Sequence, residues 1–240
     1  MQWTNKTALV TGASRGLGEA LAGALARRGV SVVGVAREAA PLEAAMARLR
    51  SDGGVAYALP GDLGDKRDIH RLVGAATALV GPIDLVVHNA STLGPLPMRV
   101  LAETDCEDLE AVLQVNLLGP FRLTKALVGQ MVLRGDGLVV LVSSDAAMNG
   151  YPRWGAYGVS KAALDQLGRT FAAELERVRF VMVDPGEMDT RMHADAMPEA
   201  DRWTLEPPAR VAARLVNLIE AGRFRSGERL DAATLGERGS

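Results

Sequence analysis

Strand-like and helix-like runs alternate along almost the whole chain, and this alternation restricts the fold more than any other feature. Residues 30–36 are nearly all apolar, as expected for a strand that is buried on both faces of a sheet. Strands that alternate with helices predict a parallel sheet with right-handed crossovers, covered by helices on both faces. Six strands are expected, at residues 7–11, 30–36, 55–59, 83–88, 138–142 and 179–183.

Helices are expected between these strands and after the last of them. The first helix contains Leu17 and ends before Gly29, and a long helical stretch at 105–134 is interrupted near residues 116–120. The tail from Arg223 is polar and Gly-rich, which fits either one short edge strand or partial disorder. Because 240 residues contain no repeat and no linker, we expect a single domain, 1–240. The remaining helices are expected at 41–49, 66–80, 157–177 and from Pro207-Pro208 to Gly222.

The composition excludes several classes of function. The formal net charge is -2 and the pI is about 6.0, so no polybasic surface favours nucleic acid or an anionic membrane. The single cysteine, Cys106, cannot form an internal disulfide, which fits a reducing compartment. Residues 1–6 lead directly into an apolar strand without a signal peptide, and no apolar run is long enough to span a bilayer. We expect a soluble cytoplasmic protein, and we assign no metal site.

The turn between the first strand and the first helix carries three glycines, Gly12, Gly16 and Gly18. Glycine lets the backbone turn sharply and approach a pyrophosphate, while the helix N-terminus offers unpaired N–H groups and a partial positive charge. The spacing is G-x-x-x-G-x-G rather than G-x-G-x-x-G, and no Gly-Lys-Ser/Thr closes the turn as in a P-loop. These residues alone fit both a nucleotide-binding turn and an ordinary tight turn of an α/β protein.

The segment Thr11-Gly12-Ala13-Ser14-Arg15-Gly16-Leu17-Gly18 resembles the cofactor fingerprint T-G-x-x-x-G-x-G of the short-chain dehydrogenase/reductase family, in its compact single-domain subclass. The resemblance extends from about residue 7 to about residue 190. It implies a Rossmann-type, doubly wound fold that binds a nicotinamide dinucleotide. The residues that it places around the phosphates are Gly12, Ser14, Arg15, Gly16, Leu17 and Gly18.

The end of the second strand bears on the choice between NAD and NADP. An acidic residue there would bind the ribose hydroxyls of NAD and repel the 2′-phosphate of NADP. The acidic position is occupied by Ala36, and Arg37 follows it. Arg37 and Arg15 would make charge-assisted contacts with one phosphate, and basic residues at these two places resemble the family's NADP-preferring members. We expect NADP(H) over NAD(H), but two ordinary surface arginines also fit, as does a shifted register in which Glu38 takes the acidic role.

The ends of the third and fourth strands also carry matches to the family. Asp62-Leu63 resembles the place where an aspartate binds the adenine, although a turn or helix-cap aspartate fits as well. The segment His88-Asn89-Ala90-Ser91 lies where the family usually has Asn-Asn-Ala-Gly. Asn89 and Ala90 match and are expected at the cofactor, whereas His88 and Ser91 depart. We interpret His88 as a structural histidine at a strand end rather than as a base.

The fifth strand ends at Ser143-Ser144, and Tyr157 and Lys161 follow it. Four residues separate Tyr157 from Lys161, so on a helix the two side chains share a face. A nearby ammonium favours the phenolate and lowers the pKa of tyrosine from its usual value near 10. Such a phenol can act as the general acid in ketone reduction or as the general base in alcohol oxidation. Ser144 can hydrogen-bond a substrate oxygen where negative charge develops.

The family resemblance assigns roles to these residues. It implies that Ser144, Tyr157 and Lys161 are the catalytic serine, tyrosine and lysine, the last two also contacting the cofactor. It adds Asn116 as a fourth member, which interrupts a helix and helps to hold a proton-relay water. Residues 184–190 resemble the family's Pro-Gly-x-x-x-Thr segment. Those that it places at the nicotinamide carboxamide are Pro185, Gly186, Met188 and Thr190.

Residues from about 187 to 206 are expected to form a lid over the nicotinamide. Family members commonly dimerise through the helix at 157–177 and the long helix before it, so we expect a homodimer, and the polar segment 226–231 leaves a homotetramer open. Large side chains near the lid suit an adaptable apolar pocket, and equally suit lid packing or oligomer contacts. They are Met192, Met197 and Trp203 in the lid and Met148, Tyr151 and Trp154 opposite it.

We predict an NADP-dependent short-chain dehydrogenase/reductase that transfers a hydride between NADP(H) and a small or medium carbonyl compound or secondary alcohol. A non-catalytic NADP-binding sensor or scaffold of the same fold is the alternative, since a fold does not fix a function. A sugar-nucleotide epimerase or dehydratase would share the tyrosine and lysine. Those relatives usually have a different glycine spacing and a longer substrate domain.

Overall fold

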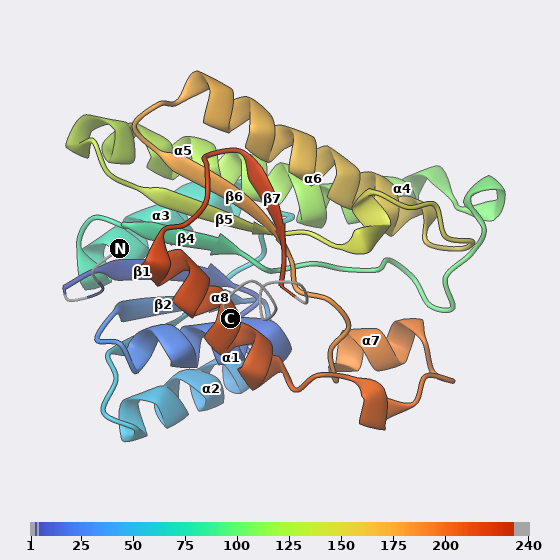
Figure 1. Ribbon diagram of the computed structural model, residues 1–240, viewed down its shortest axis with the longest axis horizontal. Coiled ribbons are helices and arrows are strands. Elements are labelled where there is room, and N and C mark those ends of the chain that lie inside the picture. The colour runs from blue at the N-terminus through green and yellow to red at the C-terminus, as the bar shows by residue number, and fades with distance from the viewer. Residues whose placement is uncertain (1–2, 4, 233–240) are drawn as a thin grey trace.

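The computed structural model describes residues 3 and 5–232, and within them seven strands form one parallel sheet (Figure 1). The order β3-β2-β1-β4-β5-β6-β7 reverses between β1 and β4, which opens a crevice at the carboxyl ends of these two strands. The predicted doubly wound α/β fold is therefore confirmed. The strands are β1 (Thr7–Thr11), β2 (Ser31–Ala36), β3 (Ala56–Pro60), β4 (Leu85–His88), β5 (Leu138–Val142), β6 (Arg179–Asp184) and β7 (Glu228–Asp231).

Helices cover both faces of the sheet (Figure 1). One face is covered by α1 (Gly16–Ala26), α2 (Ala39–Ser51) and α8 (Pro208–Ala221). The other is covered by α3 (Lys66–Val80), α5 (Gly119–Arg134) and α6 (Gly155–Glu174). Two shorter helices, α4 (Cys106–Leu113) and α7 (Arg191–Ala196), lie beyond the carboxyl edge of the sheet.

Alternation along each strand supplies both hydrophobic cores. Val10 and Val32 face the core under α1, α2 and α8, whereas Leu9 and Val33 face the core under α3, α5 and α6. Every residue of β1 and β5 is buried, which explains why these strands appear in the sequence as unbroken apolar runs. The sheet is thus a packed support that fixes where each strand ends.

The differences from the predicted elements lie at their ends. The predicted interruption of the long helix is a single π-helical turn, Gln114–Leu118, between α4 and α5. The tail contains the edge strand β7, which runs parallel to β6, and the rest of that tail, residues 233–240, lies outside the described residues. Helix α6 begins at Gly155 and ends at Glu174, so the predicted helix at 157–177 was displaced by two to three residues. Periodicity locates a helix but not its ends, which depend on local capping.

Two further features of the described residues bear on the expected class. Among residues 3 and 5–232, no helix combines the length and the apolar character needed to cross a bilayer. In the same residues there is no cluster of three or more histidine, cysteine and acidic side chains that could hold a metal ion. Cys106 is an exposed free thiol at the start of α4.

Candidate active site

A cleft of about 760 Å³ opens along the carboxyl edge of the sheet. It brings together most of the residues that the sequence analysis selected from separate segments. Four selected residues do not line it: Gly18 and Asn116, which are buried, and Ser144 and Gly186, which lie directly beside it. The selected residues that line it are Gly12, Ser14, Arg15, Gly16, Leu17, Arg37, Asp62, Leu63, Asn89, Ala90, Tyr157, Lys161, Pro185, Met188 and Thr190.

Hydrogen bonds join the glycine turn to the end of β4. The Thr11 hydroxyl accepts from the backbone N–H groups of Asn89 and Ala90, each at 3.0 Å. The Asn89 side-chain amide donates to the carbonyl oxygens of Thr11 at 3.0 Å and Gly12 at 3.3 Å. A Cβ on Gly12, where φ is 68°, would lie 2.9 Å from the Ala90 Cα. Gly12 therefore serves a close backbone approach as well as a turn.

Three charged side chains stand together at the rim of the cleft next to the end of β2. Arg15 and Arg37 both line it, as the cofactor prediction requires. Glu38 lines it too, and its carboxylate lies 2.7 Å from the Arg15 guanidinium. Both partners of this ion pair are more than half exposed, so it is weak and open to competition from another anion.

Asp62 and Leu63 line the cleft beside the end of β3. The Asp62 carboxylate accepts a hydrogen bond of 2.9 Å from the backbone N–H of Gly64 through Oδ1. The helix-capping role falls to Asp65, whose carboxylate accepts from the Arg67 N–H at the start of α3. Asp62 is thus a turn aspartate that also lines the cleft, and its binding of the adenine stays a prediction.

Tyr157 and Lys161 lie one turn apart on α6 and both line the cleft. The Lys161 Nζ lies 5.5 Å from the centre of the Tyr157 ring. That ammonium donates a hydrogen bond of 2.7 Å to the carbonyl oxygen of Val142, the last residue of β5. The end of β5 therefore holds the lysine against the sheet, and the predicted sharing of one helix face is confirmed.

Ser144 and Asn116 flank this pair. The Ser144 hydroxyl donates to the Asp145 carboxylate at 3.0 Å and accepts from the Ala146 N–H at 3.2 Å. Asn116 lies in the π-helical turn, where its side-chain amide donates to the Thr92 carbonyl and to the Ser160 hydroxyl, both at 2.9 Å. Asn116 thus ties the interruption of the helix to α6 next to Lys161.

The protonation states of the pair differ from the expectation. Burial raises the pKa of Tyr157 to about 12, against the lowering effect of the Ser144 and Ser91 side chains. Burial also lowers the pKa of Lys161 to about 8. The predicted lowering of the tyrosine pKa by the ammonium is therefore outweighed by burial, and the ammonium itself donates to the Val142 carbonyl. Near pH 7 the site holds a neutral phenol beside a mostly charged lysine.

His88 is buried at the end of β4, with its Nε2 2.8 Å from the Thr124 hydroxyl on α5. Burial lowers the pKa of this imidazole to about 3. It is absent from the residues that line the cleft, which agrees with the interpretation of His88 as a structural histidine.

Replacement of His88 by asparagine tests this burial through the acid sensitivity of folding. In the native protein the folded state keeps His88 neutral, whereas the unfolded chain takes up a proton below about pH 6.5, so stability falls as the pH drops below that value. At pH 5 the loss from this one group is about 2 kcal/mol relative to pH 7. Urea unfolding at both pH values should show a smaller acid loss in His88→Asn by that amount, and an equal loss in both proteins would refute the assignment.

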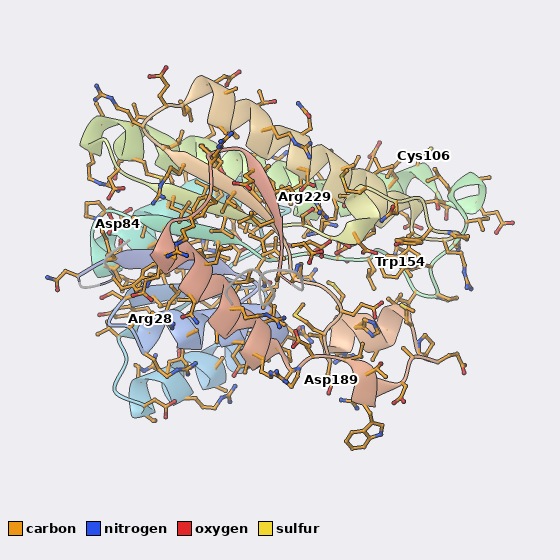
Figure 2. All side chains as sticks on the ribbon, viewed as in Figure 1. Arg28, Asp84, Cys106, Trp154, Asp189 and Arg229 are labelled. Atoms are coloured by element: carbon orange, nitrogen blue, oxygen red, sulfur yellow. The ribbon has the colours of Figure 1, made fainter. Side chains whose placement is uncertain are left out.

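The segment after β6 closes the cleft from the other side. Pro185, Met188 and Thr190 line it, and the Thr190 hydroxyl accepts from the His193 N–H as the N-cap of α7. Within the expected lid, Met192 lines the cleft and packs toward Tyr157, but Met197 and Trp203 are exposed. Figure 2 labels Asp189 in this segment, in the lower part of the view, and Trp154 above it.

The opposite wall contributes less than expected. Trp154 packs edge-on against Tyr157, with ring centres 5.6 Å apart, whereas Met148 and Tyr151 are exposed. None of these three side chains lines the cleft itself.

Two residues of the site have no role in the predictions made from the sequence. Ser91 lines the cleft beside Tyr157, and its departure from the family's glycine was the available signal. Arg229 on β7 contacts the backbone of Ser144 and two buried carboxylates, Asp165 and Asp184. No local pattern marks it, because its partners lie 45 to 85 residues away along the chain.

The chain matches a family model described as short chain dehydrogenase over residues 6–201. It is 37% identical over 188 residues to human dehydrogenase/reductase SDR family member 4, covering 78% of this chain and 67% of that protein. A short chain dehydrogenase from Pseudocercospora fijiensis is 35% identical over 200 residues, which is 80% of this chain but only 63% of that relative.

Solved structures match over nearly the whole length of both chains. A short chain dehydrogenase from Shigella flexneri in complex with NADP has a TM-score of 0.89 and 28% identity, covering 96% of this chain and 98% of its own. An alcohol dehydrogenase from Thermococcus sibiricus in complex with 5-hydroxy-NADP has a TM-score of 0.84 and 31% identity, covering 94% and 95%. The chain belongs to the short-chain dehydrogenase/reductase family of oxidoreductases.

Proposed function

We propose that the protein transfers a hydride between NADP(H) and a small or medium carbonyl compound or secondary alcohol, with Tyr157 as the proton donor and acceptor. The observation that carries this proposal is the placement of Tyr157 and Lys161 on α6, one turn apart and facing the same cleft as the glycine turn. The expected single domain with a lid at about 187–206 forms part of the proposal.

The residues of the cleft fit a nicotinamide dinucleotide. A Cβ on Gly12 would lie within 3.0 Å of Asn89 and Ala90, so the glycine turn can approach the end of β4 this closely only with glycine at this position. The N–H groups at the start of α1 would bind the pyrophosphate, and Asp62 and Leu63 would hold the adenine. Pro185, Gly186 and Thr190 would hold the carboxamide. When bound, the nicotinamide supplies or accepts the hydride.

Tyr157 is in the protonation state that carbonyl reduction needs. Because its pKa is about 12, the phenol carries a proton to give to the oxygen of a reduced carbonyl. The Ser144 hydroxyl would hydrogen-bond that oxygen as charge develops. Lys161, held by the Val142 carbonyl, would return a proton to Tyr157 through a path that Asn116 orders. For alcohol oxidation the same groups act in reverse, and the phenol then has to lose its proton.

A preference for NADP(H) rests on the basic rim of the cleft. Arg15 and Arg37 line the cleft next to the end of β2. The last residue of β2, where an NAD-binding relative would have an acidic side chain, is Ala36. The related Shigella flexneri protein carries NADP, which supports the same choice.

Arg37→Ala should lower kcat/KM for NADPH about tenfold or more and leave kcat/KM for NADH within about twofold, since a charge-assisted contact is worth about 1.5–3 kcal/mol. Glu38→Gln is the matched variant. It frees Arg15 from its ion pair and removes a negative charge from the rim, so it should raise the NADPH preference. Equal use of both cofactors by the native protein, unaffected by either variant, would contradict the NADP proposal.

The proposed assembly is a homodimer formed through α5 and α6, and a homotetramer is the alternative. Met192, which lines the cleft and packs against Tyr157, gives the substrate side an apolar side chain, and Trp154 packs against Tyr157 from outside the cleft. Such a surface suits carbonyl compounds with apolar substituents.

A panel of aldehydes and ketones, each offered with NADPH and with NADH, tests the function. Oxidation of the reduced nicotinamide is followed by absorbance. Turnover that requires a carbonyl substrate supports the proposal, whereas tight NADPH binding without turnover of any class of carbonyl or alcohol would favour a sensor or scaffold.

A further inference from the structure

Arg229 makes three hydrogen bonds to residues that lie close to the cleft without lining it. Its Nε donates to Asp165 Oδ2 at 3.0 Å, and its Nη2 donates to Asp184 Oδ2 at 2.9 Å and to the Ser144 carbonyl oxygen at 2.8 Å. Asp165 is 1% exposed and Asp184 is 7% exposed. One guanidinium from the edge strand therefore compensates two buried carboxylates.

The three partners of Arg229 belong to the three segments that carry the proposed reaction. Ser144 follows β5. Asp184 ends β6, and its other oxygen accepts a hydrogen bond of 3.0 Å from the Gly186 N–H in the Pro185-Gly186 turn. Asp165 lies on α6, one turn after Lys161. Through these contacts Arg229 links the serine, the turn proposed to meet the carboxamide, and the helix that carries Lys161.

The charges around Lys161 and Tyr157 come from several elements. Asp165 on α6 and Asp184 on β6 both act to raise the pKa of Lys161. Asp184 and Asp145, which precedes Ala146, act to raise the pKa of Tyr157. On the positive side, the Arg169 guanidinium is 4.0 Å from Asp165 and 40% exposed, so Arg229 is the closer and more buried counter-charge.

Arg229 makes the closer of two ion pairs to Asp165, at 3.0 Å against 4.0 Å for Arg169. Among the described residues, Asp165 Oδ1 is buried and has no hydrogen-bond donor, so the hydrogen bond from Arg229 to Oδ2 is the main compensation of this carboxylate. Removing one partner of a buried charge group leaves the other charges uncompensated, which is far more costly than losing a surface pair.

We propose that Arg229 is a positioning residue of this enzyme, which holds Ser144 and the Gly186 turn in register with α6 and neutralises Asp165 and Asp184 beneath Lys161. This inference rests on the proposed function. It gives the edge strand β7 a role in positioning the site, in addition to its pairing with β6.

Arg229→Met tests the inference, with Arg28→Met as the matched control. Arg28 also makes three side-chain contacts, to Glu220, Asn217 and the Ala24 carbonyl, and Figure 2 shows it on the side of the molecule away from Arg229. We expect kcat for carbonyl reduction to fall about ten- to a hundredfold in Arg229→Met, with less change in KM, since a misplacement of about 1 Å has that effect. Arg28→Met should stay within about twofold of the native protein.

A second readout needs neither cofactor nor turnover. The chain has four lysines, so the Cε signals of ¹³C-labelled lysine can be assigned and titrated by NMR. In Arg229→Met the Lys161 titration should move to higher pH than in the native protein, because Asp165 and Asp184 lose their counter-charge. It should not move in Arg28→Met. Arg229→Lys keeps the charge but not the fork of donors, so it should keep the native titration and still lose kcat.

The results separate this inference from the proposed function. If Arg229→Met matches Arg28→Met in both kcat and the Lys161 titration, Arg229 has no such role, even when Tyr157→Phe is inactive. If Arg229→Met does not fold, Arg229→Lys decides the test. A native kcat in Arg229→Lys would then overturn the inference. If the native protein reduces no carbonyl compound, the proposed function fails. The Lys161 titration in Arg229→Met can still be measured in that case, and it tests the role of Arg229 independently of turnover.

Discussion

Tyr157→Phe should lower kcat about a hundred- to ten-thousandfold, the range expected for the loss of a general acid. The Kd for NADPH should change little. The contacts of the glycine turn and of Lys161 do not involve the phenol: Thr11 and Asn89 order the turn, and the Val142 carbonyl holds the ammonium. Steady-state kinetics in both directions, together with a titration of NADPH fluorescence, measure the two quantities separately.

Tyr151→Phe is the control for this substitution. Tyr151 is 43% exposed, and its hydroxyl donates to the Asp145 carboxylate at 2.8 Å, a residue that also binds Ser144. The variant removes the same atom close to the same site but outside the cleft, so kcat should stay within about threefold. If Tyr157→Phe turned over as fast as Tyr151→Phe, the proton transfer would have to be assigned to another group.

The parts of the fold that could be predicted from the sequence are those determined by the pattern of neighbouring residues along the chain. Each buried strand is a short apolar run, and the glycine turn follows the first of them directly. The spacing of Tyr157 and Lys161 places both on one face of a helix whatever surrounds it, and that is how α6 presents them. The interruption around Asn116 was also foreseen, because a polar residue followed by Gly119-Pro120 departs from helical periodicity.

The parts that sequence did not predict depend on contacts between distant segments. The Val142 carbonyl that binds Lys161 is a backbone atom, which no residue pattern marks. Burial, which raises the pKa of Tyr157, likewise depends on the packing around the phenol and not on the spacing of Tyr157 and Lys161. Glu38 is next to Arg37 in sequence, yet its ion pair with Arg15 requires the β1–α1 turn to meet the end of β2. Arg229 meets Ser144 only because β7 adds to the edge of the sheet.

Gly18→Ala should be the most damaging single-methyl change in the glycine turn. A Cβ at this position would lie 2.2 Å from the Gly12 carbonyl oxygen and 2.4 Å from the Asn89 Nδ2, so either α1 or the turn has to move. Overpacking of this kind costs about 1–3 kcal/mol of stability, and more where the neighbour is backbone. Gly74→Ala is the matched control. Gly74 lies within α3, and apart from the neighbouring backbone of its own helix no atom lies within 4 Å of its Cβ position, so alanine there should stabilise the protein by roughly 0.5–1 kcal/mol.

The affinity for NADPH distinguishes a role of Gly18 in cofactor binding from a role in the packing of α1. A shift of the turn moves the N–H groups at the start of α1 away from the pyrophosphate, so the Kd for NADPH should rise at least tenfold in Gly18→Ala and stay native in Gly74→Ala. Urea unfolding gives the stability of each variant, and NADPH fluorescence gives its affinity under conditions where both are folded. A less stable Gly18→Ala with native affinity would mean that Gly18 serves only the packing of α1 against Gly12 and Asn89. The pyrophosphate would then have to bind elsewhere along the carboxyl edge of the sheet.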